Sequence, residues 1–157
     1  MADIGFALCQ QDWILRSGGA DGADSAFEEG AVTMSGVHRS QIFLPWPGFN
    51  GREGGKPMVR PAPWAYPIAE EHHPAWERLS DGSRALHARN VHQILGQSPE
   101  SPRSRFVICW TKGGRGGGGT GQAIRIAETY RIPVYDLADS ATFERLRRFA
   151  TNFSIGR

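Results

Sequence analysis

Two glycine-rich segments hold the residue types best suited to chemistry in this chain. Residues 17–25 read Ser-Gly-Gly-Ala-Asp-Gly-Ala-Asp-Ser, and residues 112–122 read Lys-Gly-Gly-Arg-Gly-Gly-Gly-Gly-Thr-Gly-Gln. Glycine lets a backbone approach a phosphate closely, and the first turn of a following helix offers unpaired N–H groups that attract anions. The two segments therefore predict two turns that hold the phosphate of a nucleotide. The predicted binding residues are Ser17, Gly18, Gly19, Ala20, Gly22, Asp24, Arg89, Asn90, Gly117, Gly118, Gly119, Thr120, Gly121 and Gln122.

Each glycine segment leaves an alternative open. The first is equally typical of a tight strand-to-helix turn closed by a capping aspartate. The second can be a flexible loop, although six glycines in seven positions exceed what a connector needs, since each adds to the entropy lost on folding. Thr120 is placed as the N-cap of the helix that follows. The second segment has neither the Gly-Lys-Ser/Thr ending of a Walker A motif nor a dinucleotide G-x-G-x-x-G.

Three charged residues are candidates for catalysis. Arg89, between the two glycine segments, can pair bidentately with a phosphate or be an ordinary exposed arginine. Asp24 and Glu28 are four residues apart on a predicted helix, so their carboxylates share a face and can tune each other's pKa. The alternative for this pair is a solvated surface. The histidines lack metal-ligand spacing, so we predict neither a metal nor a cofactor.

The elements that position these residues alternate along the chain. Short apolar runs predict strands at residues 13–15, 41–44, 105–110 and 132–135, and apolar stripes at helical spacing predict helices after Gly22, over 81–95, after Thr120 and over 143–150. Alternation of this kind indicates an α/β fold with a mainly parallel sheet covered by helices. Both glycine turns would then meet at the carboxyl edge of that sheet.

The stretch 46–74 interrupts this alternation. It is rich in proline and glycine and carries four aromatic residues, which favours a functional lid over a partly disordered loop. Trp64 and Tyr66 can stack on a base or pack against their own loop. We otherwise expect one domain over residues 1–157.

Composition narrows the class of protein. The chain has 157 residues, 39% of them hydrophobic, and a formal net charge of +2, which argues against a dedicated nucleic-acid binder. Cys9 and Cys109 lie among apolar residues and are expected to be reduced thiols of the core. Without a signal pattern or a membrane-spanning apolar run, a cytoplasmic protein with no membrane partner is predicted.

The order of these motifs resembles the SLOG superfamily, which unites the Lonely Guy phosphoribohydrolases with the Rossmann-like domain of DNA-processing protein A. Ser17-Gly18-Gly19-Ala20 with Gly22-Ala23-Asp24 looks like its first nucleotide-binding turn. Residues 86–90, Leu-His-Ala-Arg-Asn, resemble the Met-His-Glu-Arg-Lys segment of Lonely Guy enzymes, and Gly118-Gly119-Thr120 resembles their Gly-x-Gly-Thr core. The whole pattern is similar to small phage-type SLOG proteins. The resemblance implies a Rossmann-like three-layer domain, nucleotide binding and a homodimer.

Two departures from the superfamily bear on function. Lonely Guy enzymes cleave an N-glycosidic bond with an arginine, matched by Arg89, and a glutamate, whose position here is Ala123. A replacement acid would have to be Asp24, Glu28 or a residue of the 46–74 insertion. The superfamily also begins with a strand that this chain lacks before Trp13, so its first strand is truncated or absent.

Three functions stay open. The first is a binding module that senses or sequesters a nucleotide or a nucleotide-derived signal without the Lonely Guy chemistry, and the missing glutamate favours it. The second is an N-glycosidic hydrolase of a nucleoside monophosphate. The third is a single-stranded DNA-binding module, which the near-neutral charge disfavours.

Overall fold

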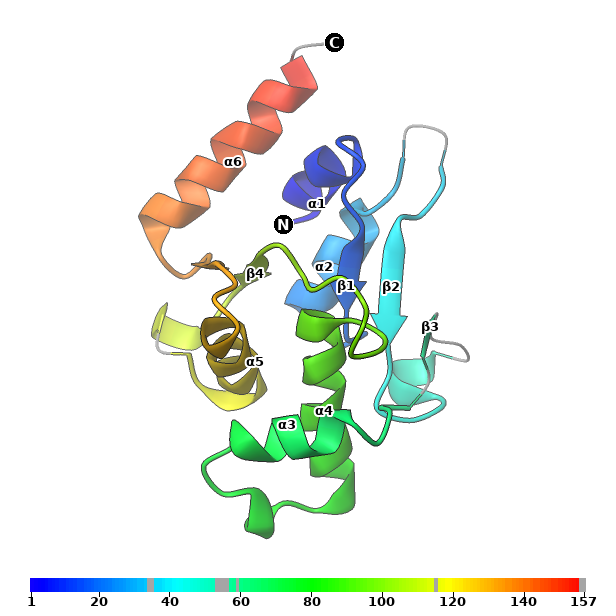
Figure 1. Cartoon of the computed structure of the whole chain (residues 1–157). Coiled ribbons are helices and arrows are strands. Elements are labelled where there is room, and N and C mark those ends of the chain that lie inside the picture. The colour runs from blue at the N-terminus through cyan, green and yellow to red at the C-terminus, as the bar shows by residue number, and fades with distance from the viewer. Residues whose placement is uncertain (34–35, 53–56, 59, 115, 156–157) are drawn as a thin grey trace.

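The computed structural model describes residues 1–33, 36–52, 57–58, 60–114 and 116–155. It is a mixed α/β fold in which helices and short parallel strands alternate (Figure 1). Arg115 of the second glycine segment, and residues 53–56 and 59 of the 46–74 insertion, lie outside the described residues. The elements, with η for 3-10 helices, are α1 (Ala2–Cys9), β1 (Leu15–Ser17), α2 (Ala23–Gly30), β2 (Ser40–Phe43), η1 (Phe49–Gly51), β3 (Pro57–Met58), α3 (Ala65–Glu71), η2 (Trp76–Arg78), α4 (Asp81–Leu95), β4 (Val107–Cys109), η3 (Lys112–Gly114), α5 (Gly118–Thr129), β5 (Val134–Asp136) and α6 (Ser140–Ile155).

The described strands form two sheets instead of one. β1, β2 and β3 pair in parallel in that order, with Arg16 opposite Gln41 and Phe43 opposite Met58. β4 and β5 form a separate parallel pair, with Ile108 opposite Tyr135. The parallel pairing agrees with the sequence prediction. The described strands do not form the single sheet that was expected.

The first strand begins later than its apolar residues predict. Trp13 and Ile14 precede β1 and are 38% and 58% exposed. Trp13 makes an edge-on contact with Phe106, with ring centroids 5.0 Å apart, just ahead of β4. The prediction of a strand at 13–15 is therefore wrong in its bounds, because β1 spans Leu15–Ser17 and the ring of Trp13 contacts Phe106 beside the second sheet.

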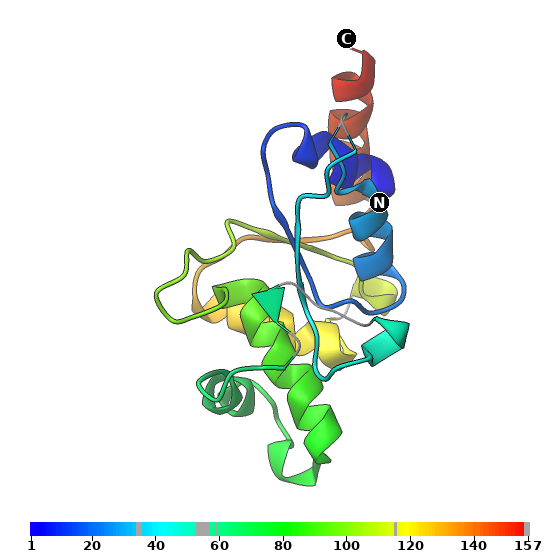
Figure 2. The same cartoon turned by 90° about the vertical axis from the view of Figure 1, so that its right-hand side faces the viewer.

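Helices lie on both sides of the strands (Figures 1 and 2). On one side α3, α4 and α5 enclose a buried cluster centred on Val91, Ile94 and Ile126. On the other side α1, α2 and α6 enclose a second cluster that includes Ile4, Phe27 and Ala150. Each sheet is thus supported by helices whose apolar faces turn towards it.

The opening helix α1 has no counterpart among the predicted elements. It packs closely on α2, where a Cβ at Gly30 would lie 2.0 Å from the carbonyl oxygen of Ala2. The hydrophobic residues of α1 do not form a clear one-sided stripe, so the helix depends on this tertiary contact more than on its own pattern.

The described residues of the 46–74 stretch have secondary structure of their own. It contains η1, β3 and α3, and Ala65 and Ala69 of α3 are fully buried. Trp64 packs edge-on against His92, with ring centroids 4.8 Å apart, and Tyr66 packs on the same core. These aromatic residues are used in packing α3 onto α4, which corrects the expectation that 46–74 lacks its own secondary structure.

Two further predictions can be compared with the fold. Cys9 and Cys109 are both buried free thiols, as expected, and burial raises the pKa of Cys109 to about 12. No helix among the described residues is long and apolar enough to cross a membrane.

Candidate functional site

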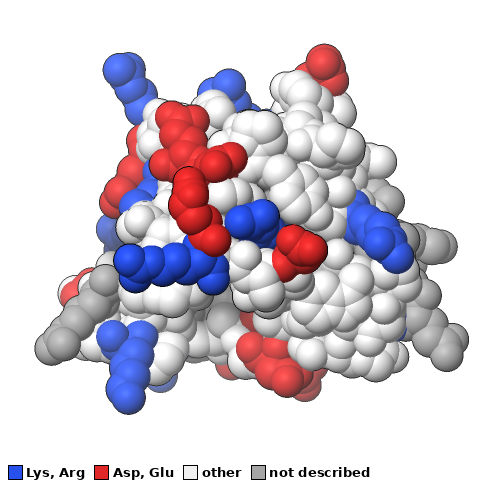
Figure 3. Space-filling view, turned by 90° about the horizontal axis from the view of Figure 1, so that it is seen from below, with Lys and Arg blue, Asp and Glu red and all other residues white. Residues whose placement is uncertain are grey.

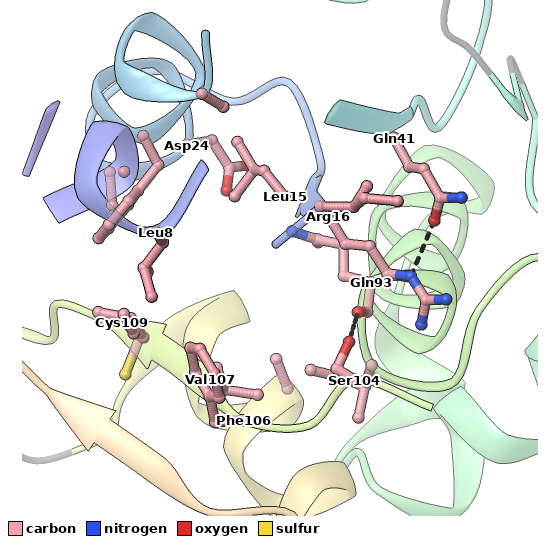
Figure 4. A pocket seen from close by; sticks show the side chains of 18 of the residues that line it. Leu8, Leu15, Arg16, Asp24, Gln41, Gln93, Ser104, Phe106, Val107 and Cys109 are labelled. Carbon is pink, nitrogen blue, oxygen red and sulfur yellow. Dashed lines mark hydrogen bonds between the residues drawn. The ribbon is translucent and has the colours of Figure 1, made fainter. Parts of the chain in front are cut away.

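Parts of both glycine segments line one cavity of about 1090 Å³ (Figure 4). Its wall includes Ala20 to Asp24 from the first segment and Gly119 and Thr120 from the second, with Arg89 and Asn90 of α4 between them. The tertiary structure thus brings together residues that are about seventy to a hundred positions apart in the chain. A cavity of this size can hold a nucleotide.

The first glycine turn is closed by its own side chains. The carboxylate of Asp24 accepts hydrogen bonds from the N–H groups of Gly18 and Ala20, both at 3.1 Å. The N–H of Gly19 donates to the hydroxyl of Ser17 at 3.1 Å. The N–H groups of Gly18, Gly19 and Ala20 are therefore satisfied within the turn, as the capping-aspartate alternative describes, and these three are not available to a phosphate.

Glu28 is also engaged within the protein. Its carboxylate accepts a short hydrogen bond from the hydroxyl of the fully buried Ser17 and forms an ion pair with Arg52 at 2.6 Å. Asp24 and Glu28 therefore do not form a carboxylate pair that shares a proton, and each one stabilises the first turn. The prediction that they form an acid–base pair finds no support in this geometry, and neither does the solvated-surface alternative.

Adjacent residues of α4 hold the two turns. Arg89 donates from Nη1 to the carbonyl oxygen of Gly18 at 2.8 Å, and Asn90 donates from Nδ2 to the carbonyl oxygen of Gly119 at 3.1 Å. Nδ2 of Asn90 also donates to Oε1 of Gln122, whose own amide donates to the carbonyl oxygen of Ala69. Asn90 and Gln122, predicted as ligand contacts, thus position the second turn.

Arg89 is a buried positive charge without a carboxylate in contact. The residue is 9% exposed, forms none of the ion pairs found among the described residues, and has an Nε atom with no hydrogen-bond partner there. Burial lowers the pKa of its guanidinium, against the attraction of the more distant Asp24. On its other side the guanidinium lies 5.8 Å from the ring centroid of Phe49. A buried cation of this kind is stabilised when an anion pairs with it.

The second glycine turn is open. α5 begins at Gly118 with Gly117 as its N-cap, so Thr120 is inside the first turn and is not the N-cap, contrary to prediction. No acceptor among the described residues takes a hydrogen bond from the N–H groups of Gly118, Gly119 or Thr120. An ideal Cβ at Gly117 or Gly119 would meet nothing within 4 Å. The fold itself does not demand glycine at these two positions.

A hydrogen-bonded pair, Thr111 and Asp136, supports the second turn and was not predicted from the sequence. Thr111 donates its hydroxyl to the carboxylate of Asp136, and the same hydroxyl accepts from the N–H of Gly116 at 3.2 Å. Burial opposes the ionisation of Asp136, but the bonds from Thr111 and Ala138 outweigh it and hold its pKa below the usual range. The sequence signal for this pair is a threonine just after one strand and an aspartate at the end of the next strand.

The rest of the cavity wall is mostly apolar. Ala123, at the position of the superfamily's glutamate, lines the cavity and offers no carboxylate. The described residues contain no cluster of three or more His, Cys, Asp or Glu side chains placed to hold a metal ion. On the face seen from below, basic and acidic side chains are interspersed and the described residues form no continuous basic stripe (Figure 3).

Comparison with known proteins does not assign this chain to a family. The chain matches no protein-family model, no curated protein and no solved structure. What the described residues establish is an α/β protein with two glycine turns, the first held by the buried Arg89 and the second by its neighbour Asn90.

Proposed function

We propose that this chain binds a nucleotide, or a nucleotide-derived ligand, through a phosphate held between Arg89 and the open turn at the start of α5. The observation that carries the proposal is Arg89, a guanidinium that is 9% exposed, has no carboxylate partner among the described residues, and lines the same cavity as Gly119 and Thr120. A phosphate would pair with this charge and accept hydrogen bonds from the free N–H groups of the helix.

The glycines of the second turn support the same reading. Glycine in the first turn of a helix is less favourable than alanine by roughly 0.5–1 kcal/mol. Gly119, which lies inside that turn, has neither a left-handed backbone nor a close neighbour that would exclude a side chain. A ligand in contact with the backbone gives this position a reason to lack a Cβ.

Binding without the Lonely Guy reaction is the form of the proposal that the site favours. Glu28 is paired with Arg52, Asp24 caps the first turn, and Ala123 occupies the position of the superfamily's glutamate. We further propose a single Rossmann-like domain of the SLOG superfamily, on the order of the motifs and the parallel strands that precede both turns.

Calorimetric titration with nucleoside mono-, di- and triphosphates and cyclic nucleotides tests the proposal. At least one nucleotide should bind, and Arg89→Ala should weaken it by roughly 10- to 150-fold, since a hydrogen bond to a charged group contributes about 1.5–3 kcal/mol. Arg89→Lys keeps the charge but loses the planar fork, so we expect an intermediate affinity. The exposed Arg78 serves as the control, and Arg78→Ala should bind like the parent chain.

Chromatography of the same mixtures separates binding from chemistry. We expect no free base above the blank. Free base that disappears in Arg89→Ala would establish the N-glycosidic hydrolase instead, and the absence of binding by any nucleotide would overturn the proposal. Circular dichroism of each variant excludes unfolding as the cause of a lost signal.

A further inference from the structure

Trp110 is set apart from the other four tryptophans of the chain by what surrounds its ring. Each of those four packs edge-on against an aromatic ring. The ring of Trp110 meets no aromatic or cationic group among the described residues, and it belongs to neither buried cluster. It is 50% exposed. The fold therefore does not use this ring for its own packing.

The backbone on both sides of Trp110 is nevertheless fixed. The carbonyl oxygen of Cys109 accepts from the N–H of Leu137 at 2.8 Å. The N–H of Thr111 donates to the carboxylate of Asp136 at 3.0 Å. The exposed ring thus stands on a held backbone just after β4 and directly before the second glycine turn. A large ring on a fixed backbone binds a flat partner with little loss of conformational freedom.

Trp110 lines the same cavity as the candidate phosphate site. Arg89, Gly119 and Thr120 contribute to that wall together with the tryptophan. Residues 20–24 of the first glycine segment, which read Ala-Asp-Gly-Ala-Asp, also line the cavity and carry short side chains. The cavity therefore holds, in one space, donors suited to a phosphate, an aromatic ring without a partner, and room for a second flat ring.

We propose that Trp110 is the platform on which the nucleobase stacks when Arg89 and the start of α5 hold the phosphate. This role rests on the proposed nucleotide binding and adds the residue that recognises the base. Every nucleobase has a flat π-face, so stacking on an aromatic side chain contributes to affinity without requiring one particular base. Trp110 thus selects nucleotides over sugar phosphates.

Other aromatic residues are less suited to this role. Trp64 and Tyr66 pack on the core between α3 and α4 and do not line the cavity. Trp13 and Phe106 line it, but their rings already contact each other. A lone exposed tryptophan elsewhere on a surface would need no explanation. The position of Trp110 beside the phosphate site is what gives its exposure a functional reason.

A comparison of nucleotides with ribose-5-phosphate tests the stacking role, because the sugar phosphate lacks only the base. The probes are the monophosphates of adenosine, guanosine, cytidine and uridine, titrated by calorimetry, with ribose-5-phosphate as a competitor. Trp110→Ala should weaken the nucleotides that bind by roughly 5- to 150-fold, the range expected for one lost base stack. Its affinity for ribose-5-phosphate should equal that of the parent chain.

Two further variants complete this comparison. Trp110→Phe keeps a π-face and should recover most of the nucleotide affinity. Arg89→Ala removes the phosphate partner and should weaken nucleotides and ribose-5-phosphate alike. The split between the two ligands therefore separates contact with the base from contact with the phosphate.

Tryptophan fluorescence gives a readout that a purely structural role of Trp110 would not change. A base stacked on the indole should quench its emission in the parent chain, whereas ribose-5-phosphate should not. The quenching should disappear in Trp110→Phe although the nucleotide still binds. Trp13→Phe is the matched control, since Trp13 is 38% exposed in the same cavity wall, and this variant should retain the quenching.

The stacking role is overturned if Trp110→Ala binds nucleotides as tightly as the parent chain, or if it weakens ribose-5-phosphate by the same factor. Quenching that is lost in Trp13→Phe and kept in Trp110→Phe would assign the base to Trp13 instead. A large fall in the urea midpoint of Trp110→Ala would make the ring part of the core. Failure of all four monophosphates to bind also overturns it, whereas the proposed function fails only if the wider panel of nucleotides gives no binding.

Discussion

The two glycine turns look alike in sequence and differ in what their glycines do. At the first turn the backbone of Gly18 and Gly19 is closely packed: an ideal Cβ at Gly18 would lie 2.6 Å from the guanidinium carbon of Arg89, and one at Gly19 would lie 2.7 Å from Leu44. At the second turn Gly117 and Gly119 face open space. The protein's own packing excludes a side chain at Gly18 and Gly19, whereas it leaves room for one at Gly117 and Gly119.

The same contrast holds for hydrogen bonds. The first turn satisfies the N–H groups of Gly18, Gly19 and Ala20 with Ser17 and Asp24, while no acceptor among the described residues takes a hydrogen bond from those of Gly118, Gly119 or Thr120. The start of α5 therefore offers backbone donors that Gly18, Gly19 and Ala20 do not. Substitutions on either side of this contrast should therefore affect different measurements.

The largest effect is expected from Gly19→Ala. Gly19 has a φ of +67°, which alanine adopts at a cost, and its new methyl group would overlap Leu44. We expect the free energy of unfolding to fall by about 2–5 kcal/mol, as strain and overpacking add. Urea denaturation measures this loss, and an unchanged midpoint would show that the first turn is not held as tightly as described.

Gly119→Ala should affect ligand binding and not stability, the opposite of Gly19→Ala. The new methyl group meets no protein atom within 4 Å, and alanine favours the helix, so the free energy of unfolding should stay equal or rise by roughly 0.5–1 kcal/mol. Nucleotide affinity should fall at least about tenfold, because the methyl group occupies space assigned to the phosphate. Calorimetry and urea denaturation on the same sample check both. Full affinity in this variant would move the phosphate away from the second turn.

A smaller effect on stability is expected from lowering the pH. It should act through His92, which lies near the first turn. His92 is fully buried, accepts from the N–H of Ala62 through Nε2 and donates through Nδ1 to the carbonyl oxygen of Gly96, so its neutral ring fits the fold. It also stacks on Phe43, next to the Leu44 that packs on Gly19. Burial lowers the pKa of His92, against a weaker opposing effect of the bond to Gly96.

Since the pKa of His92 is lower in the folded chain than the ordinary 6.5, the unfolded chain takes up the proton first. The stability that this histidine contributes is thus fully present above about pH 6.5 and is lost as the pH falls below that value. Melting temperatures between pH 7.5 and pH 5 should show the decline, and it should be shallower in His92→Asn. Equal slopes in both proteins would place the titrating group elsewhere, for instance at His87, whose pKa burial also lowers.

The smallest effect is expected from Asp24→Asn. The amide oxygen can still accept from Gly18 and Ala20, so the turn should keep its shape, while a negative charge near Arg89 is removed. We expect nucleotide affinity to rise a few-fold, measured by calorimetry at low ionic strength, where surface screening is weakest. A loss of turnover in this variant, with binding intact, would instead give Asp24 a catalytic role.

Much of the site could be read from the sequence because it depends on local backbone chemistry. Runs of glycine after an apolar strand and before a helix favour turns, and the place of Arg89 and Asn90 on one helix follows from the helical pattern of 81–95. The bounds of α4 match the predicted helix closely, since Ser80 caps it by accepting from the N–H of Ser83. Aromatic residues in 46–74 were harder to interpret, because packing on a core and stacking on a ligand need the same side chains.

What the sequence determined by itself is the alternation of strands and helices and the two glycine turns. These follow from spacing, propensity and the conformational freedom of glycine, which act over a few residues. Only the tertiary structure decided that Asp24 closes one turn while the other stays open, that Glu28 pairs with Arg52, and that β1 and β4 belong to separate sheets. Those outcomes depend on which distant groups meet in space, and on whether burial leaves a charge without its partner.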